Sequence, residues 1–103
     1  MLGGKIALVT GASRGIGRAI AVALGKAGAT VAGTATSDAG ATGISEYLRN
    51  EGLLGAGFKL NVNDAAQTEA VFAKIESEHG SVAILVNNAG ITRDNLLLRM
   101  KDA

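Results

Sequence analysis

A glycine-rich segment directly follows a short apolar run near the start of the chain, and no other feature constrains the fold as strongly. The run Ile6–Val9 has the composition of a buried strand, residues 10–17 are Thr-Gly-Ala-Ser-Arg-Gly-Ile-Gly, and helix-patterned sequence follows them. Backbone N–H groups at a helix N-terminus favour a phosphate, and glycines allow its close approach. The order therefore predicts a phosphate-binding strand–turn–helix unit, with a dinucleotide as the expected ligand.

Apolar runs alternate with helix-patterned segments over the rest of the chain. This alternation is typical of α/β proteins, in which a parallel sheet carries helices on both faces. We expect four strands, at Ile6–Val9, Thr30–Gly33, Gly57–Leu60 and Val82–Val86. The sequence has no internal repeat and no proline, so we expect residues 1–103 to belong to one domain.

The helix after the glycine-rich segment is expected to end at Gly28, because a glycine commonly follows the last turn of a helix. We predict that this helix packs on the sheet through two adjacent faces, one formed by Ile16, Ile20 and Leu24 and the other by Ala19, Ala23 and Ala27.

The second helix is predicted from Ala41 to Asn50 and has a weak start. Gly40 and Gly43 each lower its helix propensity by about 1 kcal/mol relative to alanine. The two glycines could provide flexibility near a ligand or could be a tolerated local weakness, and we favour the second interpretation.

The third helix is better specified. Asp64 is expected as its N-cap, with Gln67 three residues later in an arrangement like a capping box. We expect His79 in the last turn to interact with the helix dipole and Gly80 to end the helix. The predicted buried stripe consists of Val71, Phe72 and Ile75.

Composition and charge exclude several classes of function. The net charge is +1 with acidic and basic residues interleaved, which argues against nucleic acid or an anionic membrane as a partner. The chain has no cysteine and one histidine, so we expect neither a disulfide nor a metal site. No apolar run approaches the roughly 20 residues that span a bilayer, and no signal peptide precedes the first strand, so we expect a cytoplasmic protein.

A second motif, Asn-Asn-Ala-Gly at residues 87–90, follows the last apolar run. Together with the pattern T-G-x-x-x-G-x-G, it resembles the short-chain dehydrogenase/reductase family. Residues 5–21, 33–37 and 89–97 further resemble the members of this family that reduce 3-oxoacyl-acyl-carrier-protein in bacterial fatty-acid synthesis. The resemblance spans the chain but covers only the N-terminal half of such an enzyme.

The resemblance implies a Rossmann-type, doubly wound parallel sheet, of which this chain would supply the N-terminal half with about four strands. It also implies an acyl-carrier-protein thioester as the substrate of the complete enzyme, and a homotetramer as its assembly. A non-catalytic nucleotide-binding or subunit-complementing module is the alternative.

The expected cofactor-binding residues lie at the carboxyl ends of the predicted strands. The Ser13 hydroxyl suits phosphate hydrogen bonding better than nucleophilic attack, since no base stands beside it. Asn87 and Asn88 could contact the cofactor or could only join neighbouring strand ends by hydrogen bonds. Both alternatives stay open for Asn87, and we favour cofactor contact for Asn88. The predicted set is Gly11, Ser13, Arg14, Gly15, Ile16, Gly17, Thr36, Asn61, Val62, Asn88, Ala89 and Gly90.

The end of the second predicted strand favours NADP(H) over NAD(H). Residues 34–37 are Thr-Ala-Thr-Ser and include no acid that could accept hydrogen bonds from a ribose 2′-hydroxyl. Arg14 offers a guanidinium suited to a 2′-phosphate. Asp38 is the alternative ribose partner, but we expect it to cap the following helix.

The resemblance also implies a catalytic tyrosine with a lysine four residues later. The sole tyrosine, Tyr47, is followed at that spacing by Glu51, and a carboxylate would raise the phenol pKa. We therefore expect Tyr47 to serve at the surface or in packing, the catalytic serine, tyrosine and lysine to lie beyond Ala103, and the chain alone to be inactive. Residues 92–103 are expected to begin a further helix.

Overall fold

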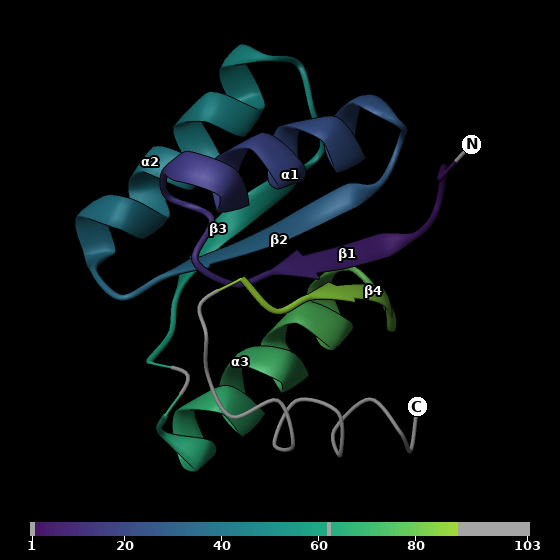
Figure 1. Cartoon of the computed structure of the whole chain (residues 1–103). Helices are drawn as coiled ribbons and strands as arrows, with labels where there is room; N and C mark the ends of the chain where they lie inside the picture. Colours follow the sequence, from purple (N-terminus) through teal and green to yellow (C-terminus); the bar gives the residue numbers. More distant parts are fainter. Residues whose placement is uncertain (1, 62, 89–103) are drawn as a thin grey trace.

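Four parallel strands form one sheet in the order β3-β2-β1-β4, and helices cover both of its faces (Figure 1). The structure, a computed structural model, describes residues 2–61 and 63–88; the helix expected over residues 92–103 lies outside them. The predicted α/β fold with a Rossmann-type parallel sheet is confirmed. Its elements are β1 (Ile6–Val9), α1 (Gly15–Lys26), β2 (Thr30–Ala35), α2 (Asp38–Asn50), β3 (Gly55–Lys59), α3 (Ala65–Glu78) and β4 (Val82–Val86).

The direction in which the sheet grows reverses at β1. From β1 the chain passes through β2 to β3 on one side, and it then crosses to the other side of β1 to form β4 (Figure 1). Val9, the last residue of β1, consequently pairs with both Gly33 of β2 and Val86 of β4. In open α/β sheets, ligands bind in the crevice at the carboxyl ends of the strands where such a reversal occurs.

The core lies on both faces of the sheet, because α1 and α2 cover one face and α3 covers the other (Figure 1). Successive strand residues point to opposite faces, so each strand can contribute to two apolar clusters. The cluster beside α3 consists of Ile6, Leu8, Ala32, Phe58, Phe72, Ile75 and Val82, and the cluster beside α1 and α2 consists of Val9, Ala12, Ala21, Val31, Ala35, Ile44, Tyr47 and Leu48.

The predicted packing faces of α1 are confirmed only in part. Ile16 is 73% exposed, and Ala19 and Ala23 are exposed as well. Ile20 and Leu24 are partly buried and pack against the cluster beside α1 and α2. The large apolar side chains of this helix are therefore not its most buried residues.

Three small residues form the buried face of α1 instead: Gly17, Ala21 and Gly25. Their spacing of four residues places them on one side of the helix. A Cβ atom at Gly25 would lie 2.8 Å from Leu53 Cδ1, which is too close for two carbon atoms. The helix packs so closely against its neighbours that glycine forms the contact, and a search for large apolar side chains misses this face.

The boundaries of β2 and β3 differ from the prediction by one or two residues. β2 continues past Gly33 to Ala35 because its last residues pair with β3, with Ala35 opposite Lys59. β3 begins at Gly55 and ends before Leu60. A glycine adds nothing to an apolar pattern, so the start of β3 carries no signal in the sequence.

α2 begins three residues earlier than predicted, and its N-cap is Ser37 instead of Asp38. The Ser37 hydroxyl accepts a hydrogen bond of 3.0 Å from the Gly40 N–H. Asp38 is the first residue of the helix, where a carboxylate still interacts favourably with the helix dipole.

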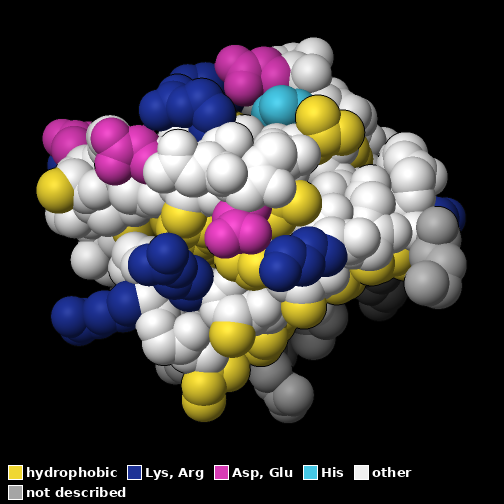
Figure 2. All heavy atoms as spheres, turned by 90° about the horizontal axis from the view of Figure 1, so that it is seen from above, with side chains coloured by type: hydrophobic (Ala, Val, Ile, Leu, Met, Phe, Trp, Pro, Cys, Tyr) yellow, Lys and Arg dark blue, Asp and Glu magenta, His cyan; other side chains and the backbone are white. Residues whose placement is uncertain are grey.

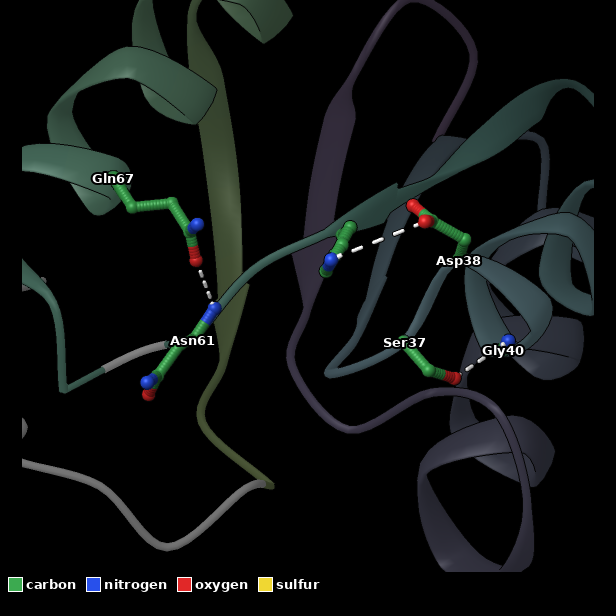
Figure 3. A network of polar contacts seen from close by, with 6 residues as sticks. Ser37, Asp38, Gly40, Asn61 and Gln67 are labelled. Carbon is green, nitrogen blue, oxygen red and sulfur yellow. Dashed lines mark hydrogen bonds and ion pairs between the residues drawn. The ribbon is translucent and has the colours of Figure 1, made fainter.

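The predicted features of α3 are largely confirmed. The Asp64 side chain accepts a hydrogen bond of 3.0 Å from the Gln67 N–H, and Gly80 follows the helix with a φ of 115°. The Gln67 side chain, however, accepts from the backbone N–H of Asn61 and not from that of Asp64, so the capping box is not reciprocal (Figure 3). Phe72 and Ile75 are buried, and Val71 is partly buried.

The two glycines of α2 have different surroundings, so one interpretation does not fit both. A Cβ atom at Gly40 would lie 2.7 Å from Ala35 Cβ and 3.2 Å from Ser37 Oγ, whereas one at Gly43 would meet nothing within 4 Å. Gly40 is therefore a packing requirement at the end of β2, and only Gly43 fits the interpretation as a tolerated local weakness.

We expect the Gly43→Ala variant to be more stable than the wild type by about 0.5–1 kcal/mol, because alanine loses less backbone entropy in a helix. Gly40→Ala is the matched variant, and the crowding at Ala35 should cancel or reverse the same gain. Chemical denaturation of both variants measures the two changes. An equal gain in stability at both positions would contradict the packing role of Gly40.

Candidate functional site

The glycine-rich segment forms a turn that leads from β1 into α1. Gly11 and Gly15 both have a φ of 63°, a backbone conformation that side chains other than glycine rarely adopt. Arg14 between them is the N-cap of α1 and has an extended backbone. Gly11 and Gly15 are thus required by the path of the turn itself.

Three other elements hold the backbone of Gly11 and Ala12. The Gly11 N–H donates to Thr34 Oγ1 at 3.3 Å, and the Ala12 N–H donates to the Thr34 carbonyl at 2.9 Å. Tyr47 of α2 donates its hydroxyl hydrogen to the Ala12 carbonyl at 2.7 Å. Beyond β4, Asn88 Nδ2 donates to the Gly11 carbonyl at 3.1 Å. β2, α2 and the end of β4 therefore fix the first half of the turn.

The second half of the turn presents the N-terminus of α1 without a side-chain cap. Ser37 and Asp64 cap α2 and α3 through their side chains, but Arg14 makes no such hydrogen bond at α1. The first N–H groups of a helix have no partners within the helix and carry a partial positive charge. Within residues 2–61 and 63–88, α1 is the helix best able to bind an anion.

A pocket of about 400 Å³ lies beside this turn. Residues from the turn, the end of β2 and the segments after β3 and β4 form its walls, so the pocket lies at the carboxyl ends of the strands. The residues that line it are Gly11, Ser13, Arg14, Gly15, Thr34, Ala35, Thr36, Leu60 and Asn88.

Six of the predicted cofactor-binding residues line this pocket: Gly11, Ser13, Arg14, Gly15, Thr36 and Asn88. The prediction missed Thr34, Ala35 and Leu60. Thr34 and Ala35 were considered only for the choice between NADP(H) and NAD(H), as part of a stretch without an acid, and were not included in the predicted binding set.

Three predicted residues lie outside the described part of the chain: Val62, Ala89 and Gly90. Ile16 and Asn61 are described but do not line the pocket. Ile16 is exposed in the first turn of α1, and Asn61 is exposed after β3.

Gly17 lies in a contact within the protein. A Cβ atom there would lie 2.0 Å from the Gly11 carbonyl oxygen and 2.6 Å from Asn88 Nδ2. We predicted that Gly17 allows the backbone to approach a ligand closely; the atoms that approach it are those of Gly11 and Asn88. Gly15 is the opposite case, because a Cβ atom there would meet nothing within 4 Å.

Asp38 does not line the pocket at the glycine-rich turn. Its carboxylate lies 3.9 Å from Lys59 Nζ in an exposed ion pair, close to the Ser37 cap (Figure 3). Asp38 lines a separate hollow formed by residues of α2, β3 and α3.

Tyr47 is a packing residue and not a surface residue. Its side chain is buried between α2 and the glycine-rich turn, and the Arg18 guanidinium lies 4.7 Å from the centre of its ring. Burial raises the pKa of Tyr47 above its ordinary value of 10.0, and the nearby charge of Arg18 lowers it in part. The hydroxyl therefore keeps its proton near neutral pH and donates to Ala12.

The charges of the visible surface do not form a patch of one sign. Figure 2 shows the molecule from above α1 and α2, where acidic and basic side chains alternate over the surface. Among the described residues, no group of three or more acidic residues, histidines or cysteines could hold a metal ion. Within that same part of the chain, no helix is long and apolar enough to cross a membrane.

Comparison with known proteins relates this chain to one family. A family model described as short chain dehydrogenase matches residues 5–103. The 3-oxoacyl-acyl-carrier-protein reductase FabG of Escherichia coli (strain K12) is 67% identical over 99 residues, which cover 96% of this chain and 39% of that protein. The reductases of the same name from Vibrio harveyi and Pseudomonas aeruginosa are 65% and 57% identical over 101 residues, which cover 98% of this chain and 40% and 41% of those proteins.

The chain therefore spans about two fifths of the length of the curated relatives it matches.

We expect Gly17→Ala to lower the free energy of unfolding by about 1–3 kcal/mol, since the added methyl group must displace backbone atoms of Gly11 in a packed contact. Gly15→Asn is the matched variant. Asparagine tolerates a positive φ and would extend into open space, so the loss there should stay below about 1 kcal/mol. Urea denaturation compares the two variants, and equal losses would count against the proposed close packing at Gly17.

Proposed function

The chain belongs to the short-chain dehydrogenase family, and from that premise we propose that it supplies the NADP(H)-binding part of a reductase. The observation that carries this proposal is the pocket at the reversal of the sheet, where the uncapped N-terminus of α1 meets the ends of β2 and β4. The complete enzyme would reduce a 3-oxoacyl group on acyl carrier protein to the 3-hydroxyacyl group.

The first part of the proposal concerns the pyrophosphate of the cofactor. The N-terminus of α1 lacks a side-chain cap, and Gly15 leaves open space beside it. Such a helix terminus binds anions through backbone N–H groups that would otherwise lack a partner. The residues present therefore fit a pyrophosphate, with the Ser13 hydroxyl as an additional donor.

The second part is the choice of NADP(H) over NAD(H). Arg14 and Thr36 line the same pocket, and no acidic residue is among the described residues that line it. Asp38, the alternative partner for a ribose hydroxyl, lies at a different hollow and faces Lys59. A guanidinium without a competing carboxylate favours a 2′-phosphate.

The remaining predicted contacts follow from the family relationship. Asn61 and Val62 would border the adenine, next to Leu60 in the pocket wall. Asn88, Ala89 and Gly90 would border the ribose and the nicotinamide. Gly17 acts within the protein by allowing α1 to pack on Gly11. Ile16 would contact the cofactor from the first turn of the same helix.

The bound cofactor supplies a hydride, and a proton must come from a separate group. Tyr47 does not fit that second role, because its hydroxyl is buried and bonded to the Ala12 carbonyl. The proton donor would therefore belong to the part of the enzyme beyond the 39–41% that this chain covers. By the same relationship, we propose acyl-carrier-protein thioesters as substrates and a homotetramer as the assembly.

Titration calorimetry with NADPH and NADH tests the choice of cofactor. We expect Arg14→Ala to weaken NADPH binding by about ten- to a hundredfold. This loss of affinity corresponds to the free energy of one charge-assisted hydrogen bond to a phosphate. NADH binding should change much less.

Arg49→Ala is the matched control for this titration, since it removes the same charge at the far end of α2. Arg49→Ala should leave the affinities for NADPH and NADH within about twofold of the wild type. Surface charges separated by more than the Debye length, about 8 Å at physiological salt, are largely screened from each other. Equal weakening of NADPH and NADH by Arg14→Ala would contradict a contact with the 2′-phosphate.

A further inference from the structure

Two other elements hold Ala12 in the glycine-rich turn. It is fully buried, its N–H donates to the Thr34 carbonyl, and its carbonyl accepts from the Tyr47 hydroxyl. Its methyl group lies 3.0 Å from the position that a Cβ atom at Gly33 would occupy. Both polar backbone groups of Ala12 and its side chain are thus fixed by β2 and α2.

Tyr47 contacts the chain on both sides of residues 13–17, of which Ser13, Arg14 and Gly15 line the pocket. Its hydroxyl binds Ala12, just before that segment, and its ring packs under Arg18, just after it. Residues 13–17, which contain the uncapped N-terminus of α1, lie between these two contacts. One side chain on α2 therefore restrains both ends of the segment.

We propose that Tyr47 is a positioning residue for the pyrophosphate of the cofactor. By donating a hydrogen bond to the Ala12 carbonyl, Tyr47 fixes the turn whose backbone N–H groups would bind the pyrophosphate. The inference rests on the function proposed above. Without the hydroxyl, the buried Ala12 carbonyl has no donor among the described residues. An unpaired buried carbonyl is unfavourable, so rotation of the backbone toward another donor would lower the free energy. Rotation at Ala12 moves the neighbouring residues Gly11 and Ser13, both of which line the pocket.

The position of Tyr47 confines its influence to one part of the ligand. It does not itself line the pocket, and its hydroxyl and the face of its ring contact Ala12 and Arg18, respectively. At the end of β2 it shares an apolar cluster with Ala35, a contact that does not involve the hydroxyl. The 2′-phosphate depends on Tyr47 less than the pyrophosphate does. Arg14, its proposed partner, follows Ala12 in the turn, but its long side chain can compensate for a small shift of the backbone, whereas the backbone N–H groups that would bind the pyrophosphate cannot. Loss of the hydroxyl consequently affects ligands that contain a pyrophosphate more than ligands that contain only the adenosine 2′-phosphate.

The test compares two ligands by calorimetry, NADPH and adenosine 2′-monophosphate. In Tyr47→Phe we expect NADPH to bind about three- to tenfold more weakly, the equivalent of one lost hydrogen bond, while adenosine 2′-monophosphate binds within about twofold of the wild type. Thr68→Val is the matched control. It removes another buried hydroxyl that donates to a backbone carbonyl, that of Asp64, in α3 and away from the pocket. Both ligands should bind this control as they bind the wild type.

A second measurement needs no substitution and so stands even if Tyr47→Phe does not fold. Tyr47 is the sole tyrosine of the chain, and isotope labelling of tyrosine at Cζ, the ring carbon that bears the hydroxyl, therefore yields a single resonance. This resonance should shift when the wild type binds NADPH and should shift much less when it binds adenosine 2′-monophosphate.

The outcomes separate the two proposals. If the wild type binds no NADPH, the proposed function is wrong. If the wild type binds NADPH but Tyr47→Phe weakens both ligands equally, or neither, then Tyr47 is only a structural residue and the inference is wrong. A ring resonance that does not respond to NADPH overturns it in the same way.

Discussion

The contact between α1 and the end of β1 is the constraint on which the site depends. Gly17 packs on the Gly11 carbonyl so closely that a methyl group would have no room, and Asn88 donates a hydrogen bond to the same carbonyl. This contact sets the distance of α1 from the sheet and thereby the place of its N-terminus. A bulkier residue at position 17 would separate the helix from the strand and remove one wall of the pocket.

The elements with local chemical signals could be predicted from the sequence. Four apolar runs identified the strands, and Asp64 and Gly28 were recognised at helix ends because capping depends on a few neighbouring residues. The glycines of the turn were recognised for the same reason. The family resemblance then implied a doubly wound parallel sheet, and the structure adds the order of its strands.

Features that depend on distances between remote segments could not be predicted in this way. The buried face of α1 consists of Gly17, Ala21 and Gly25, and a hydrophobic pattern does not register glycine. The role of Tyr47 depends on a hydrogen bond to a residue 35 positions away. The wall formed by Ala35 depends on how far β2 pairs with β3. In each case the missing information is tertiary geometry.

The hydrogen bonds that hold the turn differ greatly in the length of chain they close. Thr34, Tyr47 and Asn88 lie 23, 35 and 77 positions from their partners in the turn. Because each bond requires its loop to be closed, the turn acquires its final form only when β4 has joined the sheet. A ligand that recognises the finished turn then binds only the fully assembled sheet. Its binding free energy is thereby added to the stability of contacts far from the pocket.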